Sequence, residues 1–246
     1  MKSLKTSGII IKRSNFAEAD RILTVLTDRL GKIKAMAKGV RKIKSKMAGS
    51  LEPYMLVDLQ LHEGKTFYIV TGASIILEYQ NIHSDIKKTA QAFFVGELID
   101  KFVEENQKAD SIFDLANMTF SAIERDQKNL IILAFQLKII EEAGFKPEIY
   151  NCLHCKEKLT ADDNFWDHIE GGIICMNCQQ KFRHGEKISD SAIKALRFIE
   201  QNNYTQIEKL KLDKGIENEL DKILLDYIRG ILEKDIKSRK FLNQVG

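Results

Sequence analysis

The sequence contains no long hydrophobic run, and proline, tryptophan and cysteine are all scarce in it. Its 246 residues include two prolines, one tryptophan and four cysteines. No window approaches the roughly 18 consecutive apolar residues that a membrane-spanning helix needs. The apolar run near the start covers only residues 8–11, which is too short for the core of a signal peptide. We therefore expect a cytoplasmic protein with no membrane contact, whose cysteines bind metal or stay reduced rather than form disulfides.

Acidic residues are missing from residues 32–46, KIKAMAKGVRKIKSK, where seven side chains are Lys or Arg. The net charge of the whole chain is only +3, but it is divided unevenly. Residues 1–50 hold 13 Lys and Arg against 3 Asp and Glu, a net charge of +10, whereas the remaining residues hold 25 against 32, a net charge of −7. This asymmetry predicts a polyanion-binding face at one end of the molecule only.

Low-complexity segments and internal repeats are also absent, so the predicted elements rest on hydrophobic periodicity. Between about residues 6 and 80 the period is two, and HEGK at 62–65 predicts a hairpin turn. Five short strands favour a small closed barrel, because closure removes exposed strand edges. The runs of β-branched, aromatic or alternating residues that predict these strands are 7–14, 21–27, 32–38, 54–61 and 66–77.

From residue 86 onward the period changes to that of helices. In the segment 129–144, Asn129 is the expected N-cap and Gly144 the expected left-handed residue after the helix. Its apolar residues on most sides predict the buried centre of a bundle. The fold class is therefore α+β, with a barrel domain at 1–80 and a helical domain at 81–246 that contains an inserted segment at 148–185. The segments with helical spacing are 86–102, 111–126, 129–144, 189–202 and 215–242.

The four cysteines form two pairs, Cys152-x2-Cys155 and Cys175-x2-Cys178, with nineteen residues between them. Two residues between cysteines let a tight turn direct both sulfurs at one ion, and two such turns complete a tetrahedron. The spacing predicts a zinc-ribbon-like segment that binds one zinc ion. Four thiolates leave no open coordination position, so the ion is expected to be structural rather than catalytic.

Histidines near the cysteines offer two alternatives. His154 and His184 flank the turns and could replace a cysteine as ligand, although a surface position is the default for histidine. His168 and Glu170, followed by the second cysteine pair, superficially match the zinc deaminase pattern. That pattern also needs a proline before the cysteine pair, which is missing here, and it would leave Cys152 and Cys155 without a role, so we reject it.

In the basic stretch, strand alternation places Ile33, Ala35 and Ala37 on an inner face. Lys32, Lys34, Met36 and Lys38 then lie on an outer, cationic face, and Gly39 turns the chain into a loop. A phosphate backbone is the best counter-charge for such a surface, since Lys and Arg contacts release condensed counterions. The predicted nucleic-acid-binding residues are Lys32, Lys34, Lys38, Arg41, Lys42, Lys44 and Lys46, with Arg13 and Arg21 extending the patch.

Motifs for nucleotide or nucleophilic chemistry are lacking. Residues 63–66, EGKT, end like a P-loop, but the earlier glycine of that motif is Leu59 here and the stretch lies in a predicted hairpin. We therefore expect a binding protein rather than an enzyme. Charge on the barrel suits DNA and RNA alike, so a DNA-binding protein and an RNA- or ribosome-associated protein both stay open.

Residues 15–54, from NFAEAD to SLEPY, resemble the N-terminal signature of the bacterial recombination and repair family RecO. That signature has an acidic-x-Asp motif before a strand, a turn from Thr to Gly, a Lys-Gly-basic loop and a Leu-x-Pro. Residues 144–155, GFKPEIYNCLHC, resemble the stretch that leads into the family's cysteine segment, and IKSRKFL at 236–242 resembles its closing helix. The matching positions are Asp20, Thr27, Gly31, Lys38, Gly39, Arg41, Ser45, Leu51, Pro53, Gly144, Pro147, Cys152 and Cys155.

The resemblance implies an N-terminal OB-fold, a central helical domain and a zinc-ribbon-like insertion. It implies a non-enzymatic mediator of the RecF pathway that binds single- and double-stranded DNA and anneals complementary strands. Such a mediator helps to load recombinase onto strands covered by single-stranded-DNA-binding protein. The implied partners are RecR and the acidic C-terminal tail of that single-strand binder, and the implied location is the cytoplasm, at the nucleoid.

Overall fold

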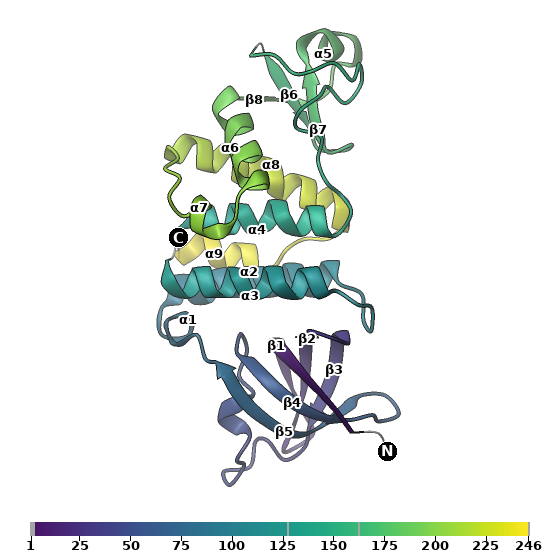
Figure 1. Cartoon of the computed structure of the whole chain (residues 1–246), viewed down its shortest axis with the longest axis vertical. Coiled ribbons are helices and arrows are strands. Elements are labelled where there is room, and N and C mark those ends of the chain that lie inside the picture. Colours follow the sequence, from purple (N-terminus) through teal and green to yellow (C-terminus); the bar gives the residue numbers. More distant parts are fainter. Residues whose placement is uncertain (1–2, 127, 162, 246) are drawn as a thin grey trace. The chain divides into compact units, whose positions relative to one another are not determined.

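The computed structural model describes residues 3–126, 128–161 and 163–245 (Figure 1). The chain divides into two compact units. The first unit comprises Met1–Gln127 and Ile236–Gly246, and the second unit comprises Lys128–Asp235. The helices that directly follow residue 80 thus group with the barrel. The predicted domain boundary at residue 80 is placed where the hydrophobic period changes, and it stays a prediction.

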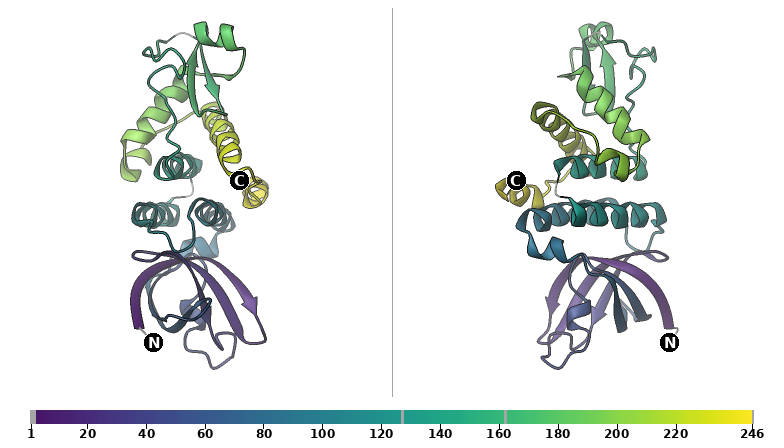
Figure 2. Two further views of the ribbon diagram at one scale, coloured as in Figure 1. Left: turned by 90° about the vertical axis from the view of Figure 1, so that its right-hand side faces the viewer. Right: turned by 60° about the vertical axis from the view of Figure 1, so that its left-hand side comes forward.

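The barrel of the first unit closes from five strands, as the sequence predicts, in the order β1-β2-β3-β5-β4 (Figures 1 and 2). Neighbouring strands are antiparallel except for the parallel pair β3 and β5, and β4 closes the barrel by pairing with β1. This arrangement is an OB-fold. The strands are β1 (Ser3–Phe16), β2 (Asp20–Thr27), β3 (Gly31–Ala37), β4 (Leu56–His62) and β5 (Tyr68–Leu77).

The interior of the barrel is filled by the apolar residues that alternate along these strands. Each fully buried Ile, Leu or Val contributes roughly 1.5–3 kcal/mol relative to an exposed one. A slip of one residue in any strand would move its whole apolar set to the outside, so the alternation fixes the strand register. The strand residues of this core include Ile10, Leu23, Val25, Ile33, Ala35, Val57, Leu59, Leu61 and Val70.

Helices of the first unit pack on the barrel and on one another. The long helix α2 starts at Asp85, whose carboxylate accepts the backbone N–H groups of Lys87 and Lys88 at 2.8 and 3.2 Å. Gly96 lets α2 approach the barrel closely, since a Cβ there would lie 2.9 Å from the Tyr54 ring. The helices of this unit are α1 (Gln80–Ser84), α2 (Ile86–Phe102), α3 (Asp110–Arg125) and α9 (Ser238–Val245).

The predicted single helical stretch at 215–242 is wrong, because the chain forms two helices there. Helix α8 (Lys214–Leu232) ends at Glu233, whose φ of +49° lies in the left-handed region. Helix α9 then belongs to the first unit, and its N-terminus is held by Glu97, whose carboxylate accepts the N–H groups of Lys237 and Ser238 at 3.0 and 2.7 Å. The apolar period continues across the break, so periodicity alone does not reveal it.

The second unit is a helical bundle around α4 (Asn129–Glu142), which contacts α6 (Asp190–Gln201), α7 (Tyr204–Ile207) and α8. All residues from 130 to 137 are buried, which confirms α4 as the bundle's centre. Its predicted N-cap is wrong by one residue, because Lys128 occupies that position. Gly144 has the expected left-handed φ of +87°. None of the helices in the described ranges has the length and apolar composition needed to cross a membrane.

The described residues between 148 and 188, which we call the cysteine segment, contain a small sheet with the strand order β7-β6-β8. Helix α5 comes directly after β7 along the chain. Trp166 of β6 is fully buried and meets the ring of Tyr227 on α8 edge-on, with ring centroids 5.9 Å apart. The Tyr227 hydroxyl donates to the carbonyl of Phe145 at 3.1 Å, so α8 anchors the segment. Its elements are β6 (Asn164–Asp167), β7 (Gly172–Cys175), α5 (Met176–Phe182) and β8 (Glu186–Ile188).

Candidate nucleic-acid interface and metal centre

Strand β3 carries the first part of the basic stretch. Ile33, Ala35 and Ala37 are fully buried in the barrel, as predicted. The prediction that Lys32 lies on an exposed outer face is wrong, because this residue is only 6% exposed. Its ammonium lies 3.1 Å from Asp100 Oδ1 and also donates to the backbone carbonyl of Asp100.

Asp100 lies in the last turn of α2, which explains the burial of Lys32. A cation there satisfies a terminal carbonyl and complements the helix dipole. Burial by itself raises the pKa of Asp100, but the charges and hydrogen bonds of Lys32 and Lys12 lower it overall. Lys34 pairs with Glu105 just beyond the same helix. Lys32 therefore holds the end of α2 to the barrel and is not available to a phosphate.

The second part of the basic stretch is the loop at 38–46, which we call the basic loop. Gly39 starts it with a φ of +65°, where glycine is favoured, and donates its N–H to Asp20 at 2.7 Å. The N–H of Arg41 donates to the carbonyl of Ala19 at 3.0 Å. The Arg41 guanidinium donates to the carbonyls of Ala17 and Glu18 at 3.3 and 3.1 Å. The loop is thereby fixed to the turn between β1 and β2, one of the regions that bind oligonucleotides in OB-folds.

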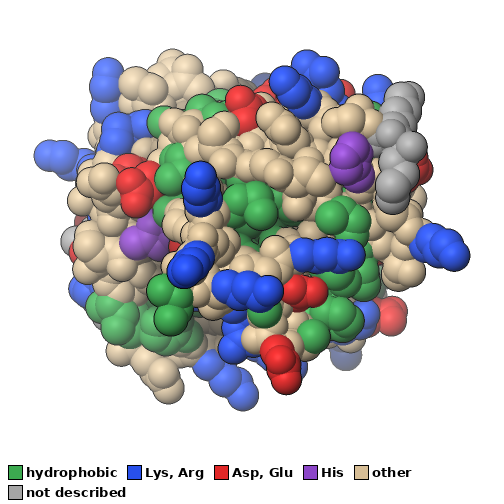
Figure 3. Space-filling model, turned by 90° about the horizontal axis from the view of Figure 1, so that it is seen from below, with side chains coloured by type: hydrophobic (Ala, Val, Ile, Leu, Met, Phe, Trp, Pro, Cys, Tyr) green, Lys and Arg blue, Asp and Glu red, His purple; other side chains and the backbone are tan. Residues whose placement is uncertain are grey.

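Five cations of the basic loop are exposed, and within the described part of the chain none of them has a carboxylate in ion-pair distance. Ile43 stands fully exposed among them. Figure 3 views the barrel from the lower side of Figure 1, and Lys and Arg side chains gather there with few acidic side chains between them. These cations are Lys38, Arg41, Lys42, Lys44 and Lys46.

Arg13 and Arg21, which extend the predicted patch, share one carboxylate. Arg21 pairs with Glu52 at 3.1 Å, and Arg13 pairs with the other oxygen of the same group. The Arg21 side chain is only 18% exposed. The pair therefore offers less free charge to a ligand than the basic loop does.

A groove of about 870 Å³ runs between β1, α2 and α9 within the first unit. Its apolar walls include Tyr54, Phe93 and Phe241. The acids of the groove are already partnered, Glu97 by the N-terminus of α9 and Asp100 by Lys12 and Lys32. The groove is partly apolar and its cations outnumber its acids, although Lys12, Lys101 and Arg13 each lie within ion-pair distance of a carboxylate. Its cations are Lys12, Arg13, Lys101 and Lys237.

The four cysteines come together as predicted, with all their sulfurs within 4.8 Å of one another. The sulfurs of Cys155 and Cys175 are 3.9 Å apart, close to the edge of about 3.8 Å that a tetrahedron with zinc–sulfur bonds of about 2.3 Å has. The N–H of Cys175 donates to the sulfur of Cys152 at 3.4 Å. This group of sulfurs can hold a metal ion and is consistent with zinc.

The acid–base behaviour of these thiols fits a cation at their centre. Burial opposes ionisation of Cys152, but the backbone N–H groups of Cys175, Cys155 and His154 lower its pKa to about 6. Burial, together with the neighbouring sulfurs, raises the pKa of Cys178 to about 12. One thiolate forms readily and then opposes the ionisation of the others. A divalent cation removes that repulsion, so the full set of thiolates fits a metal-bound state.

Two family models together match nearly the whole chain. Residues 1–79 match the family model "Recombination protein O N terminal", and residues 83–240 match "Recombination protein O C terminal". The chain belongs to the RecO family. It is 37% identical over 242 residues to the DNA repair protein RecO of Dehalococcoides mccartyi strain 195, covering 98% of this chain and 95% of that protein. It is 28% identical over 247 residues to DNA repair protein RecO of Thermoanaerobacter sp., covering 100% and 99%.

Several residues that carry the RecO resemblance have clear structural roles. Asp20 anchors Gly39 at the start of the basic loop. The Thr27 hydroxyl donates to the carbonyl of Gly31 at 2.8 Å and accepts the N–H of Leu30 at 2.9 Å, which closes the turn between β2 and β3. Gly31 has a φ of +67°, and a Cβ there would lie 1.7 Å from the carbonyl oxygen of Gln107. The RecO signature thus specifies both ends of β3, the turn from β2 at Gly31 and the start of the basic loop after Ala37.

Sequence reasoning missed the acidic partners of the patch. Glu52 pairs with two arginines from different strands, and Asp100 and Glu105 pair with the lysines of β3. No local motif marks these three acids, because their partners lie far away along the chain. The membership of the RecO family does assign the chain to DNA repair and recombination.

Proposed function

We propose that this RecO-family protein is a non-enzymatic recombination mediator that binds single- and double-stranded DNA through the basic loop. The observation that carries the proposal is the set of five exposed, unpaired cations fixed to the β1–β2 turn of an OB-fold. Lys38, Arg41, Lys42, Lys44 and Lys46 contact phosphates, and the exposed Ile43 lies against bases. Arg13, Arg21 and Lys34 act at the margin, since each has a carboxylate partner.

Such a surface supports annealing of complementary strands. Two strands repel each other, and a cationic surface that holds one strand lowers the repulsion met by the second. Contacts to phosphate carry no sequence information, so base pairing stays free to select the complement. Neither step uses ATP. The protein thereby helps to load recombinase onto strands covered by single-stranded-DNA-binding protein.

One structural zinc ion belongs to this proposal, bound by Cys152, Cys155, Cys175 and Cys178. Four thiolates close its coordination shell, so the ion supplies folding energy and no reaction. The ion would join the two cysteine turns, which lie beside the small sheet whose Trp166 packs against Tyr227 on α8. Metal is therefore needed for the order of this segment and not for contact with DNA.

The groove between β1, α2 and α9 supports a protein partner with an acidic, partly apolar end. Its excess of cations over acids and its aromatic walls suit the C-terminal tail of the single-strand binder, with Lys237 as a cation that no carboxylate of the described residues pairs. RecR is the second protein partner, and the protein works in the cytoplasm, at the nucleoid.

The alternative function is RNA binding in an RNA- or ribosome-associated role. A competition experiment separates the two: a labelled single-stranded DNA is bound by the full chain and displaced by unlabelled DNA or RNA of the same sequence. If the protein is a recombination mediator, unlabelled DNA should compete at least as well as RNA, and the protein should accelerate the annealing of complementary DNA strands. A clear preference for RNA without DNA annealing would favour the alternative.

A further inference from the structure

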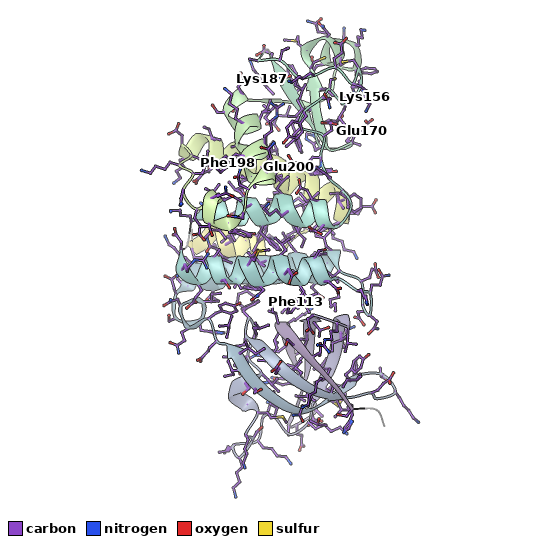
Figure 4. All side chains as sticks on the ribbon, viewed as in Figure 1. Phe113, Lys156, Glu170, Lys187, Phe198 and Glu200 are labelled. Carbon is purple, nitrogen blue, oxygen red and sulfur yellow. The ribbon has the colours of Figure 1, made fainter. Side chains whose placement is uncertain are left out.

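Two histidines and an aspartate form a second group of metal-binding side chains in the cysteine segment. A ring nitrogen of His154, a ring nitrogen of His184 and a carboxylate oxygen of Asp167 lie within 4.8 Å of one another. In the part of the chain that the structure describes, these histidines group with Asp167 and not with the four sulfurs, so they are not substitutes for a cysteine. Figure 4 labels a near neighbour of each residue in the chain: Lys156 follows His154 by two residues, Glu170 follows Asp167 by three, and Lys187 follows His184 by three.

The carboxylate of Asp167 is built into the fold, with Oδ1 held by the backbone and Oδ2 facing His184. The residue is only 2% exposed. Its Oδ1 accepts the backbone N–H groups of Ile169 and Glu170 at 2.8 and 3.1 Å, which fixes the plane of the group. Nδ1 of His184 lies 2.9 Å from Oδ2, yet no N–H among the described residues is aimed at Oδ2 in hydrogen-bonding geometry. A buried carboxylate oxygen without a donor calls for a cation or a water.

His154 is also a member of the group and carries a second unsatisfied atom. Its Nε2 is buried and has no hydrogen-bond partner. The ring stacks against Phe182 with centroids 4.3 Å apart and meets the His184 ring at 89° with centroids 5.5 Å apart. Two imidazoles at right angles, beside one carboxylate oxygen, can direct their lone pairs at one point.

The backbone on both sides of His184 positions its imidazole, which is the third ligand of the group. Arg183 ends α5 with a φ of +56°, and Gly185 continues with a φ of +102°. A Cβ at Gly185 would lie 3.2 Å from the Cβ of Phe165, so the glycine keeps this turn close to β6 and to Asp167. The His184 side chain is 38% exposed, which gives a hydrated ion a path to the group.

We infer that His154, Asp167 and His184 bind a second divalent cation of the zinc class, separate from the ion of the four cysteines. Two imidazoles and one carboxylate are a ligand set that zinc accepts, with bonds of about 2.0–2.2 Å. Ligand atoms at most 4.8 Å apart need shifts of about 1 Å to reach those bonds, which side-chain rotation supplies. Three protein ligands leave one position open to water or to an oxygen ligand.

The two sites share one turn of the chain, since His154 lies between Cys152 and Cys155. They differ in their ligands, and cobalt distinguishes them. Cobalt bound to thiolates has strong sulfur-to-metal charge-transfer absorption, whereas cobalt bound to nitrogen and oxygen has only weak d–d bands. The test is a cobalt titration of the full chain, freed of metal under reducing conditions, with zinc counted in parallel by metal analysis.

The wild-type chain should bind two cobalt ions, and only one of them should add sulfur absorption. His184→Ala and Asp167→Asn should each reduce the number from two to one and leave the sulfur absorption intact. The matched control is His168→Ala, which removes an exposed histidine next to Asp167 and should keep both ions. A single ion in the wild-type chain would overturn the inference, as would two ions in both His184→Ala and Asp167→Asn. If a variant lost the sulfur absorption as well, its fold would have been disturbed, and the number of cobalt ions bound by the wild-type chain would then decide whether the second site exists.

Discussion

Removing three cations from the basic loop should weaken the binding of single-stranded DNA and flatten its salt dependence by a predictable amount. Each phosphate contact on a single strand contributes about 0.7 to the slope of log affinity against log salt. The five exposed cations of the loop therefore give a slope of about −3.5 if all make contact. The variant Arg41→Ala/Lys42→Ala/Lys44→Ala removes three of these contacts, so its slope should be about 2 units shallower.

The change in slope also determines how much affinity the variant loses at a given salt concentration. If the lines for wild type and variant meet near 1 M salt, a slope difference of about 2 makes the variant about 100-fold weaker at 0.1 M. The loss should be equal for strands of different sequence, since phosphate contacts do not read bases. The assay is fluorescence anisotropy of labelled oligonucleotides between about 0.05 and 0.5 M salt, a range over which such interactions are only partly screened.

Two further variants separate charge from loop structure. Arg41→Ala also removes the hydrogen bonds to Ala17 and Glu18, so Lys38→Ala/Lys42→Ala/Lys44→Ala removes the same charge without them. The matched control, Lys209→Ala/Lys211→Ala/Lys214→Ala, removes three exposed cations of the second unit and should keep the wild-type slope. Equal slopes for the wild type and both loop variants, or an equal loss in the control, would refute the assignment of the loop.

Three other predictions concern the supports of the site. Lys32→Met should lower the free energy of unfolding by about 2 kcal/mol, because it leaves the partly buried Asp100 with only the exposed Lys12 as a charge partner. Asp100→Leu should restore most of the loss; chemical denaturation tests this, and unchanged stability would contradict it. The pKa values of Glu97 and Asp100 are lowered, so the stability that these carboxylates contribute is complete above their ordinary pKa values of 4.5 and 3.8 and is lost as the pH falls through the lowered values. In Glu97→Gln, the free energy of unfolding should fall less steeply as the pH is lowered; an unchanged pH dependence would count against this role. Cys155→Ser should expose residues 152–178 to limited proteolysis and leave DNA affinity unchanged; an equal loss of affinity would show that the metal supports binding as well.

Local patterns predicted the elements whose cause is local. The alternation of Ile33, Ala35 and Ala37 specifies the inner face of β3, and the barrel closes as five alternating strands require. The spacing of Cys152, Cys155, Cys175 and Cys178 brings four sulfurs together. Gly144 marks the end of α4 because the left-handed backbone there favours glycine.

Features that depend on distant segments were not predictable in the same way. Lys32 looks like an outward-facing cation of its strand, and only the end of α2 packed over it explains its burial. The apolar period runs on past Glu233, but Glu97 caps a new helix there from 140 residues away. His154, Asp167 and His184 have no recognised spacing, because the turns after β6 and α5 bring them together.

Annealing of coated strands tests the central claim most directly. Complementary oligonucleotides, one carrying a fluorophore and one a quencher, are covered with single-stranded-DNA-binding protein and mixed with the full chain in the absence of ATP. The account predicts rapid quenching with the wild-type chain, slow quenching with Arg41→Ala/Lys42→Ala/Lys44→Ala, and slow quenching when the acidic tail of the single-strand binder is removed. No acceleration with the wild-type chain and intact tails, or acceleration only after ATP is added, would contradict it.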